Sequence, residues 1–393
     1  MRVVFVRSND HDITPAIPRA LEATQGVFDE VHVLCWNRLN EQVPPESREA
    51  CVRVKRFMVK APKPRSFWVV LYTLLYQAWV FWNLIHIRPD VVHACGWDSG
   101  APAALACWIL RKRLVYDIRD PFAVCYRCSP LVHKIMYAFD WCVMAMASAF
   151  VVPTDRYVPY LGRWGRSGRE ICIVPNTCHD LLAELPHDVD TASPKPAETV
   201  RLAYLGYLTE NRGSQWLLDL CRESDGGVEL IVAGGCRSSV LQAEFESSPN
   251  VRFLGRVPYL RSLSLMRDGD AVTLLYDPDW PINRVLDPTK FYEAMMVGTP
   301  VLVSEGVSIA GLVAENGLGF VVRHGSLEGL RNAVQCLRDR ETMAAMRSRC
   351  RQYYLDNLRL SKALMGYRTF YLHLIPAQGP GEGIVMREEL EKT

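Results

Sequence analysis

The chain has 393 residues, of which 49% are hydrophobic and 22% are charged. This length exceeds what one hydrophobic core usually needs, and the composition excludes a disordered chain. The 45 basic and 43 acidic residues leave a net charge of +2, which excludes the strongly basic surface expected of a nucleic-acid-binding protein.

The N-terminus and the cysteines both predict a protein that stays in the cytoplasm. A short apolar run ends at Arg7, whereas the apolar core of a signal peptide needs about seven to fifteen residues. The 13 cysteines are an odd number spread along the chain, which favours reduced thiols over a disulfide framework.

The first half of the chain alternates short runs rich in Val and Ile with longer helical stretches. Strands are predicted over residues 2–6, 30–35, 91–94, 113–117, 150–153 and 171–174. This alternation is typical of parallel β-α-β units with helices on both faces of the sheet. We predict a doubly wound, Rossmann-like N-terminal domain over residues 1–178.

A second series of the same kind follows a stretch over residues 179–200 that holds prolines and acids without periodicity, which we interpret as a linker. The later strands are predicted over residues 200–205, 228–233, 251–254, 271–276, 300–304 and 319–322. They predict a second Rossmann-like domain over residues 201–360. A helix over 361–376 is expected to pack back on the first domain, and 377–393 is expected to be a frayed tail. The fold class is therefore α/β, with two doubly wound parallel-sheet domains facing across a cleft.

The segment 287–304 carries the clearest local signals for a ligand site. Pro288 suits the start of a helix and Gly298 suits its end. The free amides at such a start, with Lys290 beside them, favour a phosphate group. Glu293 lies about one turn further and can accept hydrogen bonds from a ribose. The alternative is a surface helix with an ordinary Lys–Glu pair.

This segment resembles the donor-binding motif of GT-B glycosyltransferases, particularly glycosyltransferase family 4, in its form P-x-K-x-x-E-x-M-x-x-G-x-P-V. Further matches occur in the family's order: RPDVVHA at 88–94, VYDIRD at 115–120, VPNT at 174–177, YLGYL at 204–208, IVAGG at 231–235 and VRFLGRVP at 251–258. The resemblance covers nearly the whole chain and implies the GT-B fold.

Carried over by position, the resemblance implies a donor site for a nucleotide-diphospho-sugar carrying UDP or GDP. The implied donor-binding residues are Gly206, Arg212, Lys290, Phe291, Tyr292 and Glu293. Glu293 is expected to bind the ribose, while Lys290, Arg212 and the first amides of the helix hold the diphosphate. The resemblance also implies transfer with retention of anomeric configuration and no obligatory metal, so no cofactor beyond the donor is expected. The lone C-x-x-C at 125–128 has no second ligand pair at zinc spacing.

Three positions depart from the family pattern and leave the sugar open. Val285 stands where the family has a second Glu, so Asp287 and its loop, or backbone amides, would have to contact the sugar. Cys95 stands where the family often has a His, with Asp98 close behind. Arg119 replaces another frequent His.

Candidate catalytic residues are Asp98, Arg119 and Asp120. Arg119 and Asp120 follow a strand at the expected ligand edge of the sheet, although a structural ion pair is an equal alternative. His93 is expected to be a buried strand residue. Candidate acceptor-binding residues are Asp10 and Asp12, which follow the first strand.

Residues 53–87 predict contact with an anionic membrane surface. Residues 67–87 carry no charge over 21 positions, and six cations precede them between residues 53 and 65. We favour a helix lying in the headgroup region over a buried core helix or a true membrane span. This contact predicts a peripheral protein on the cytoplasmic face with a lipid-linked or other glycan acceptor.

Together these features predict a retaining glycosyltransferase of polysaccharide biosynthesis that moves a sugar from a nucleotide donor to a lipid-linked glycan. Two alternatives stay open. One is a GT-B-fold sugar-nucleotide epimerase, which would need acid–base groups at the hexose. The other is a catalytically silent GT-B protein that binds within a glycan-assembly complex.

Overall fold

The structure is a computed structural model that describes residues 1–9, 16–38, 43–49, 51–62, 68–125, 128–186, 198–236 and 238–375. The chain divides into two compact units. The first unit comprises residues 1–119, 135–174 and those from 362 onward, and the second comprises residues 120–134 and 175–361. Half of the predicted linker, residues 187–197, and the whole predicted tail lie outside the described residues.

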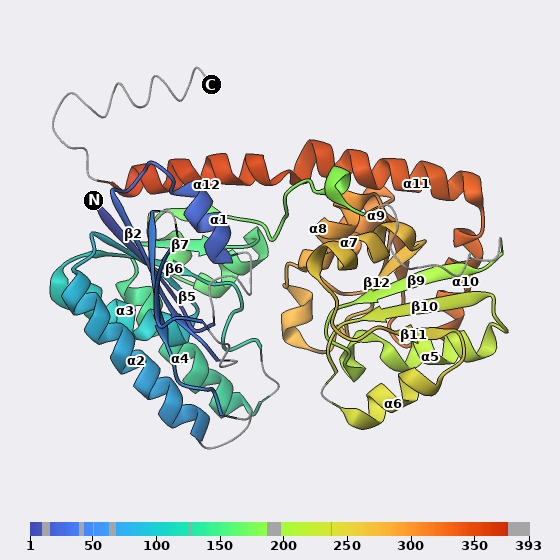
Figure 1. Cartoon of the computed structure of the whole chain (residues 1–393), viewed down its shortest axis with the longest axis horizontal. Helices are drawn as coiled ribbons and strands as arrows, with labels where there is room; N and C mark the ends of the chain where they lie inside the picture. Colours follow the sequence, from blue (N-terminus) through green and yellow to red (C-terminus); the bar gives the residue numbers. More distant parts are fainter. Residues whose placement is uncertain are drawn as a thin grey trace. The chain divides into compact units, whose positions relative to one another are not determined.

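The first unit is built on an eight-stranded sheet, here sheet A, with the order β3-β4-β2-β1-β5-β6-β7-β8 (Figure 1). Its strands are β1 (Arg2–Arg7), β2 (Glu30–Trp36), β3 (Glu46–Glu49), β4 (Val52–Phe57), β5 (Val91–Cys95), β6 (Arg113–Asp117), β7 (Ala149–Val152) and β8 (Ile171–Ile173). Every pairing is parallel except that of β3 with β4. The sequence did not predict β3 and β4, because their charged residues match an edge hairpin and hide the apolar pattern.

The helices of the first unit lie on both faces of sheet A. They are α1 (Ala16–Ala23), α2 (Trp68–Ile87), α3 (Trp97–Leu110), α4 (Pro130–Met146) and α12 (Leu360–Leu374), with short 3-10 turns at Asp155–Leu161 and Trp164–Arg166. On one face, Ile17 of α1 and Tyr371 of α12 share a core with Phe5, Val33 and Val115 of the strands. On the other face lie α2, α3 and α4 (Figure 1).

The second unit is built on a six-stranded, wholly parallel sheet, here sheet B, with the order β11-β10-β9-β12-β13-β14. Its strands are β9 (Val200–Leu205), β10 (Val228–Ala233), β11 (Val251–Phe253), β12 (Ala271–Leu274), β13 (Val301–Ser304) and β14 (Gly319–Val322). Its helices are α5 (Ser214–Glu223), α6 (Ser239–Ser247), α7 (Tyr259–Asp268), α8 (Thr289–Val297), α9 (Ala310–Asn316), α10 (Leu327–Leu337) and α11 (Arg340–Tyr353). Shorter turns are Leu182–Glu184, Glu210–Arg212, Pro281–Arg284 and Tyr354–Leu358.

Sheet B is covered on both faces by separate hydrophobic cores. Side chains of α7, α8, α9 and α11 form the core on one face, and those of α5, α6 and α10 form the core on the other. The predicted fold class of two α/β units with parallel sheets is therefore confirmed. In sheet B the strand order reverses between β9 and β12, and open sheets of this kind bind ligands outside the carboxyl ends of the strands at such a reversal.

Candidate active site

Glycines in the turns that follow β9 and β10 leave the backbone without side chains at the strand reversal of sheet B. Gly206 ends β9 with a φ of 134°. At Gly234, which ends β10, a Cβ atom would lie only 1.7 Å from the carbonyl oxygen of Gly206. A side chain at position 234 is therefore excluded, because the main chains of the two turns are in close contact at the carboxyl ends of the strands.

Helix α8 begins and ends where the sequence predicts. Pro288 precedes its first residue, and Gly298 ends it in the left-handed conformation with a φ of 74°. The Gly298 amide closes the helix on the carbonyls of Ala294 and Met295. At the other end, the first amides of the helix have no carbonyl one turn earlier, so this end attracts anions.

Lys290 and Glu293 form an ion pair of 2.7 Å near the start of α8. The pair is not the solvated surface pair of the alternative interpretation, because the Glu293 side chain is only 3% exposed and that of Lys290 is 24% exposed. Burying a carboxylate costs free energy unless partners compensate it. The partly exposed ammonium of Lys290 can bind a phosphate at the helix start, and the carboxylate of Glu293 can accept a hydrogen bond from a hydroxyl group.

Arg212 and the ring of Tyr276 belong to the same group of side chains as Lys290 and Glu293. The Arg212 guanidinium lies 5.3 Å from the centre of the Tyr276 ring and beside Gly206. Burial raises the pKa of Tyr276, Arg212 lowers it and Glu293 raises it, so the three groups share one electrostatic environment. Sequence reasoning missed Tyr276. The available signal was its place just after β12, at the strand reversal.

The side chains of Phe291 and Tyr292 lie in the hydrophobic core of the second unit. The Phe291 amide already donates to the carbonyl of Pro288, and the Tyr292 hydroxyl donates to Asp287 at 2.6 Å. Phe291 and Tyr292 therefore stabilise the position of α8 through the core, and their predicted contact with the donor stays a prediction. The amides of Thr289 and Lys290 are left to face an anion.

Asp287 has a structural task, and a contact between its carboxylate and the sugar stays a prediction. Its second carboxylate oxygen accepts from the Asn176 amide at 2.7 Å, although 111 residues separate the two in the chain. The Asn176 side chain donates to the Asp287 carbonyl at 2.8 Å. Asp287 thus ties the turn at 174–177 to the start of α8.

A further polar cluster lies at the carboxyl ends of β12, β13 and β14, and sequence reasoning missed it. The His324 Nδ1 atom lies 3.2 Å from the Ser304 hydroxyl, and its Nε2 atom lies 3.6 Å from the Asp277 carboxylate. The indole of Trp216 packs edge-on against the imidazole with ring centres 4.1 Å apart. The cluster connects the loop before α8 to the end of β14.

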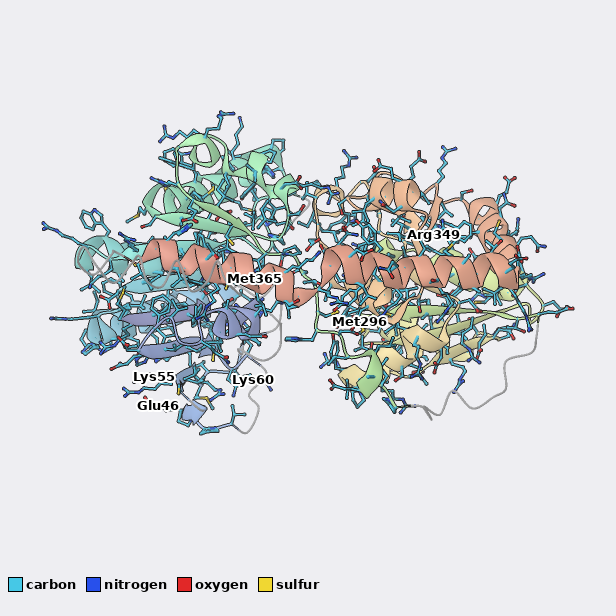
Figure 2. All side chains as sticks on the ribbon, turned by 90° about the horizontal axis from the view of Figure 1, so that it is seen from above. Glu46, Lys55, Lys60, Met296, Arg349 and Met365 are labelled. Atoms are coloured by element: carbon cyan, nitrogen blue, oxygen red, sulfur yellow. The ribbon has the colours of Figure 1, made fainter. Side chains whose placement is uncertain are left out.

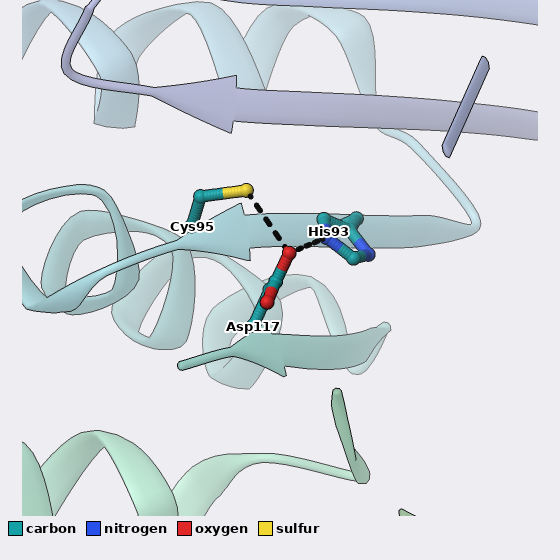
Figure 3. Close-up of side chains that lie close together, drawn as sticks. All are labelled: His93, Cys95 and Asp117. Atoms are coloured by element: carbon teal, nitrogen blue, oxygen red, sulfur yellow. Dashed lines mark hydrogen bonds and ion pairs between the residues drawn. The ribbon is translucent and has the colours of Figure 1, made fainter. Parts of the chain in front are cut away.

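The carboxyl ends of β5 and β6 in sheet A hold a wholly buried polar cluster (Figure 3). Asp117 accepts from Cys95 at 3.5 Å and from Arg119 at 2.9 Å, and it lies 3.1 Å from the Nε2 atom of His93. The other imidazole nitrogen lies 2.8 Å from the Tyr371 hydroxyl of α12. The prediction of a buried His93 is confirmed.

His93, Cys95 and Asp117 lie close enough to share a metal ion, but their chemistry does not fit one. Burial raises the pKa of the Cys95 thiol, and the Asp117 carboxylate raises it further, so the thiol keeps its proton. The Arg119 guanidinium already balances Asp117 and would repel a second cation. Burial alone would raise the pKa of Asp117, but Arg119 and His93 together bring it below its usual range.

The candidate catalytic residues occupy different environments. Arg119 is buried, pairs with Asp117 and donates to the carbonyl of Val174, which fits the structural alternative. Asp98 is 18% exposed and lies 3.4 Å from Arg38, while Asp120 is exposed. A catalytic role for any of them stays a prediction. Asp10 and Asp12 lie outside the described residues.

Two family descriptions match the chain in an order that follows its two sheets. The glycosyl transferase 4-like domain matches residues 14–177, and the glycosyl transferases group 1 domain matches residues 199–340. Fold and site together define a two-domain enzyme of the GT-B class. The chain belongs to the GT-B glycosyltransferases, and the protein is a sugar-transferring enzyme. No curated protein sequence matches it significantly.

Solved structures share this fold at low sequence identity. Sucrose-phosphate synthase from Thermosynechococcus elongatus matches with a TM-score of 0.75 and 16% identity over 95% of this chain and 99% of that one. HepE from Anabaena, in complex with UDP and glucose, matches with a TM-score of 0.67 and 17% identity over 100% of both chains. A putative UDP-N-acetylglucosamine 2-epimerase from Listeria monocytogenes matches with a TM-score of 0.64 and 15% identity over 95% and 97%.

Proposed function

We propose that the protein is a retaining glycosyltransferase that uses a nucleotide-diphospho-sugar. The observation that carries this proposal is the buried Glu293 beside Lys290 at the start of α8, with Arg212 over Tyr276 at the strand reversal. This group offers an acceptor for the ribose hydroxyls and two cations for a diphosphate. The complexes of HepE with UDP and with UDP-glucose support a uridine nucleotide as the donor.

The proposed reaction breaks the bond between the sugar C1 atom and the diphosphate oxygen. A bond forms between C1 and an acceptor oxygen on the same face of the sugar. The acceptor hydroxyl gives its proton to the departing diphosphate, which therefore acts as the base. Negative charge grows on the diphosphate during this step, and Lys290, Arg212 and the amino end of α8 are placed to stabilise it.

We propose a lipid-linked glycan at the cytoplasmic face of the membrane as the acceptor. The support is α2, whose 20 residues carry no charge and which exposes several large apolar side chains. Among the described residues, α2 is the one helix that is long and apolar enough to cross a membrane.

A sugar-nucleotide epimerase is the second candidate, since the Listeria protein shares the fold. Such an enzyme would convert the donor to an epimer without any acceptor. Product analysis separates the two, because a transferase forms a glycoside with the anomeric configuration of the donor.

The donor site is tested by titrating UDP into the Glu293→Gln variant, in which one carboxylate oxygen becomes an amide. Loss of a charged hydrogen bond costs about 1.5–3 kcal/mol, so we expect binding roughly 10- to 100-fold weaker by calorimetry. The matched control is Glu315→Gln, which changes an exposed carboxylate of α9. Equal UDP affinity in both variants would contradict the proposed site.

A further inference from the structure

We propose that α2, α3 and α4 together form a membrane-docking face, with the three helices lying in the plane of an anionic bilayer. This inference deepens the proposed function by naming the surface that meets the lipid. The sequence-based expectation placed the contact on residues 53–87 and left open whether residues 131–150 add to the same face or pack in the core.

The exposed apolar side chains of the first unit concentrate on these helices. Among its described residues, 15 large hydrophobic side chains are exposed, and 12 of them lie on the three helices. Six are on α2, three on α3 and three on α4: Trp68, Val70, Leu71, Leu74, Leu75, Trp82, Leu105, Trp108, Ile109, Ile135, Phe139 and Met146. The exposed fractions of Trp108, Trp82 and Phe139 are 70%, 64% and 60%. An apolar surface of this extent is typical of a protein or membrane contact.

The three helices are neighbours, so their exposed side chains belong to one face. The hydroxyls of Tyr76 in α2 and Ser99 in α3 lie 3.3 Å apart. A Cβ atom on Gly100 of α3 would lie 2.9 Å from Val143 of α4, so these helices are in close contact. Figure 1 shows all three on the same face of sheet A.

The pattern of α2 shows why so much apolar surface stays outside. The side chains buried in this helix are Tyr76, Val80 and Leu84, which form one narrow stripe at intervals of four residues. A helix in water would carry polar residues around such a stripe, yet α2 is apolar on its other sides as well. In the 18-residue stretch of α2 with the highest mean hydropathy, only 17% is buried.

The charges around this face suit an anionic bilayer. The carboxylates of α3 and α4 are withdrawn from it, because Asp98 lies beside Arg38 and Asp140 is fully buried against the hydroxyls of Tyr116 and Tyr160. Arg88 follows the end of α2, and Arg111 caps the end of α3. Both are exposed and can meet anionic headgroups.

The basic stretch that precedes α2 contributes less than its sequence suggests. Lys55 pairs with Glu46 at 2.9 Å, and Figure 2 shows these two side chains together at the β3–β4 edge. Arg56 is 7% exposed and donates to the hydroxyl of Ser47 at 2.8 Å. Lys63 and Arg65 lie outside the described residues. Arg53 and Lys60 of this stretch are exposed, so they can add to the contact that the apolar face makes.

An in-plane position follows from the connections of α2. Strand β4 precedes the helix and β5 follows it, and both belong to sheet A. A spanning α2 would place its two ends on opposite sides of a bilayer about 30 Å thick and would pull the sheet apart. A helix that keeps its stripe on α3 and turns its other sides to the interface breaks no contact.

The proposal is tested by flotation of the full chain with vesicles of phosphatidylcholine, alone or mixed with phosphatidylglycerol. We expect the chain to float, more strongly with the anionic lipid. The triple variant Trp82→Ser, Trp108→Ser and Phe139→Ser removes one exposed aromatic from each helix. Its partition onto vesicles is expected to fall at least 100-fold, because each buried aromatic contributes roughly 1.5–3 kcal/mol.

The matched control replaces Val240, Tyr259 and Leu260 with Ser, since these are exposed apolar residues of the second unit. It is expected to float like the unchanged chain. A second variant with only Trp108→Ser and Phe139→Ser is expected to lose at least tenfold, which separates the three-helix face from α2 alone.

Three results would overturn the proposal. The first is that the chain does not float with either vesicle, and the second is that the triple variant floats as well as the unchanged chain. The third is that light scattering shows this face joining two copies of the chain. UDP binding distinguishes this failure from a failure of the donor site. A chain that binds UDP through Glu293 but ignores vesicles refutes only the membrane face, and one that floats without binding UDP refutes only the donor site.

Discussion

The carboxyl ends of the two sheets place charge in opposite ways. In sheet A, Asp117, His93 and Arg119 satisfy one another in a buried cluster that Tyr371 of α12 closes. Beside sheet B, Arg212 and Lys290 are half-buried, with Arg212 next to Gly206 and Lys290 paired with Glu293. The same β-α-β topology therefore yields a structural core in one unit and a place for an anion in the other.

The outer helices of the two units differ as well. Among the described residues, α5 to α11 around sheet B expose three large hydrophobic side chains, whereas α2, α3 and the later part of α4 expose 12. The described helices of the second unit therefore have few exposed apolar side chains, whereas those of the first unit have many. The comparison supports the proposals of a nucleotide at sheet B and a membrane contact on the first unit, and the following predictions test it.

The largest effect is expected from Asp117→Asn in sheet A. The variant leaves the buried guanidinium of Arg119 without its counter-charge, which costs about 3–5 kcal/mol of unfolding free energy. Urea unfolding of the first unit measures the loss. Asp279→Asn is the control, because that side chain is 74% exposed, and it should change stability by less than about 0.5 kcal/mol.

The same pair has a defined pH dependence. The pKa of Asp117 is lowered in the folded unit, so its stabilising effect is complete above the unfolded pKa of about 4. The effect is lost as the pH falls below that value. The stability difference between the unchanged chain and Asp117→Asn should therefore shrink in acid, and a difference that grows there would contradict a buried ion pair.

The next largest effect is expected from Arg212→Met in sheet B. This change removes a cation from the departing diphosphate, and loss of one such group lowers the rate of transfer by about 10²- to 10³-fold. Steady-state release of the nucleotide diphosphate is the measurement. Arg222→Met changes an arginine of α5 that pairs with Glu244 on the surface, and it should leave the rate intact.

A smaller effect is expected at Tyr276, whose ring supports Arg212. Tyr276→Leu removes the cation–π contact of about 0.5–1 kcal/mol, so UDP binding should weaken roughly two- to fivefold. Tyr276→Phe keeps the ring and should bind UDP like the unchanged chain. Equal losses in both variants would show that the hydroxyl, and not the ring, is what the site uses.

The smallest effect is expected at His324. Burial lowers its pKa, while Asp277 and Asp279 act in the opposite direction, so the folded unit resists protonation of the imidazole. The unfolded chain then binds more protons below about pH 6.5, and the second unit should lose stability as the pH falls through that range. His324→Gln should flatten this slope in thermal melts, whereas a change at the exposed His179 should not.

Local patterns in the sequence determined the regular elements. The apolar runs predicted the six strands of sheet B. Pro288 and Gly298 predicted the ends of α8, because proline fixes its own φ and glycine adopts a positive φ without steric cost. The motif around Lys290 and Glu293 also predicted the family, which the comparisons confirm.

Only the tertiary structure decided which of these side chains are available to a ligand. The sequence offered Asp287 as one possible sugar contact, and the structure shows that its carboxylate also accepts from Asn176, which is remote in the chain. Arg119 follows its strand as a catalytic residue would, yet Asp117 lies beside it in the interior. For the apolar residues of α4, the sequence left core packing and surface contact as equal alternatives. Burial and pairing depend on segments far apart in the chain, so no local pattern records them.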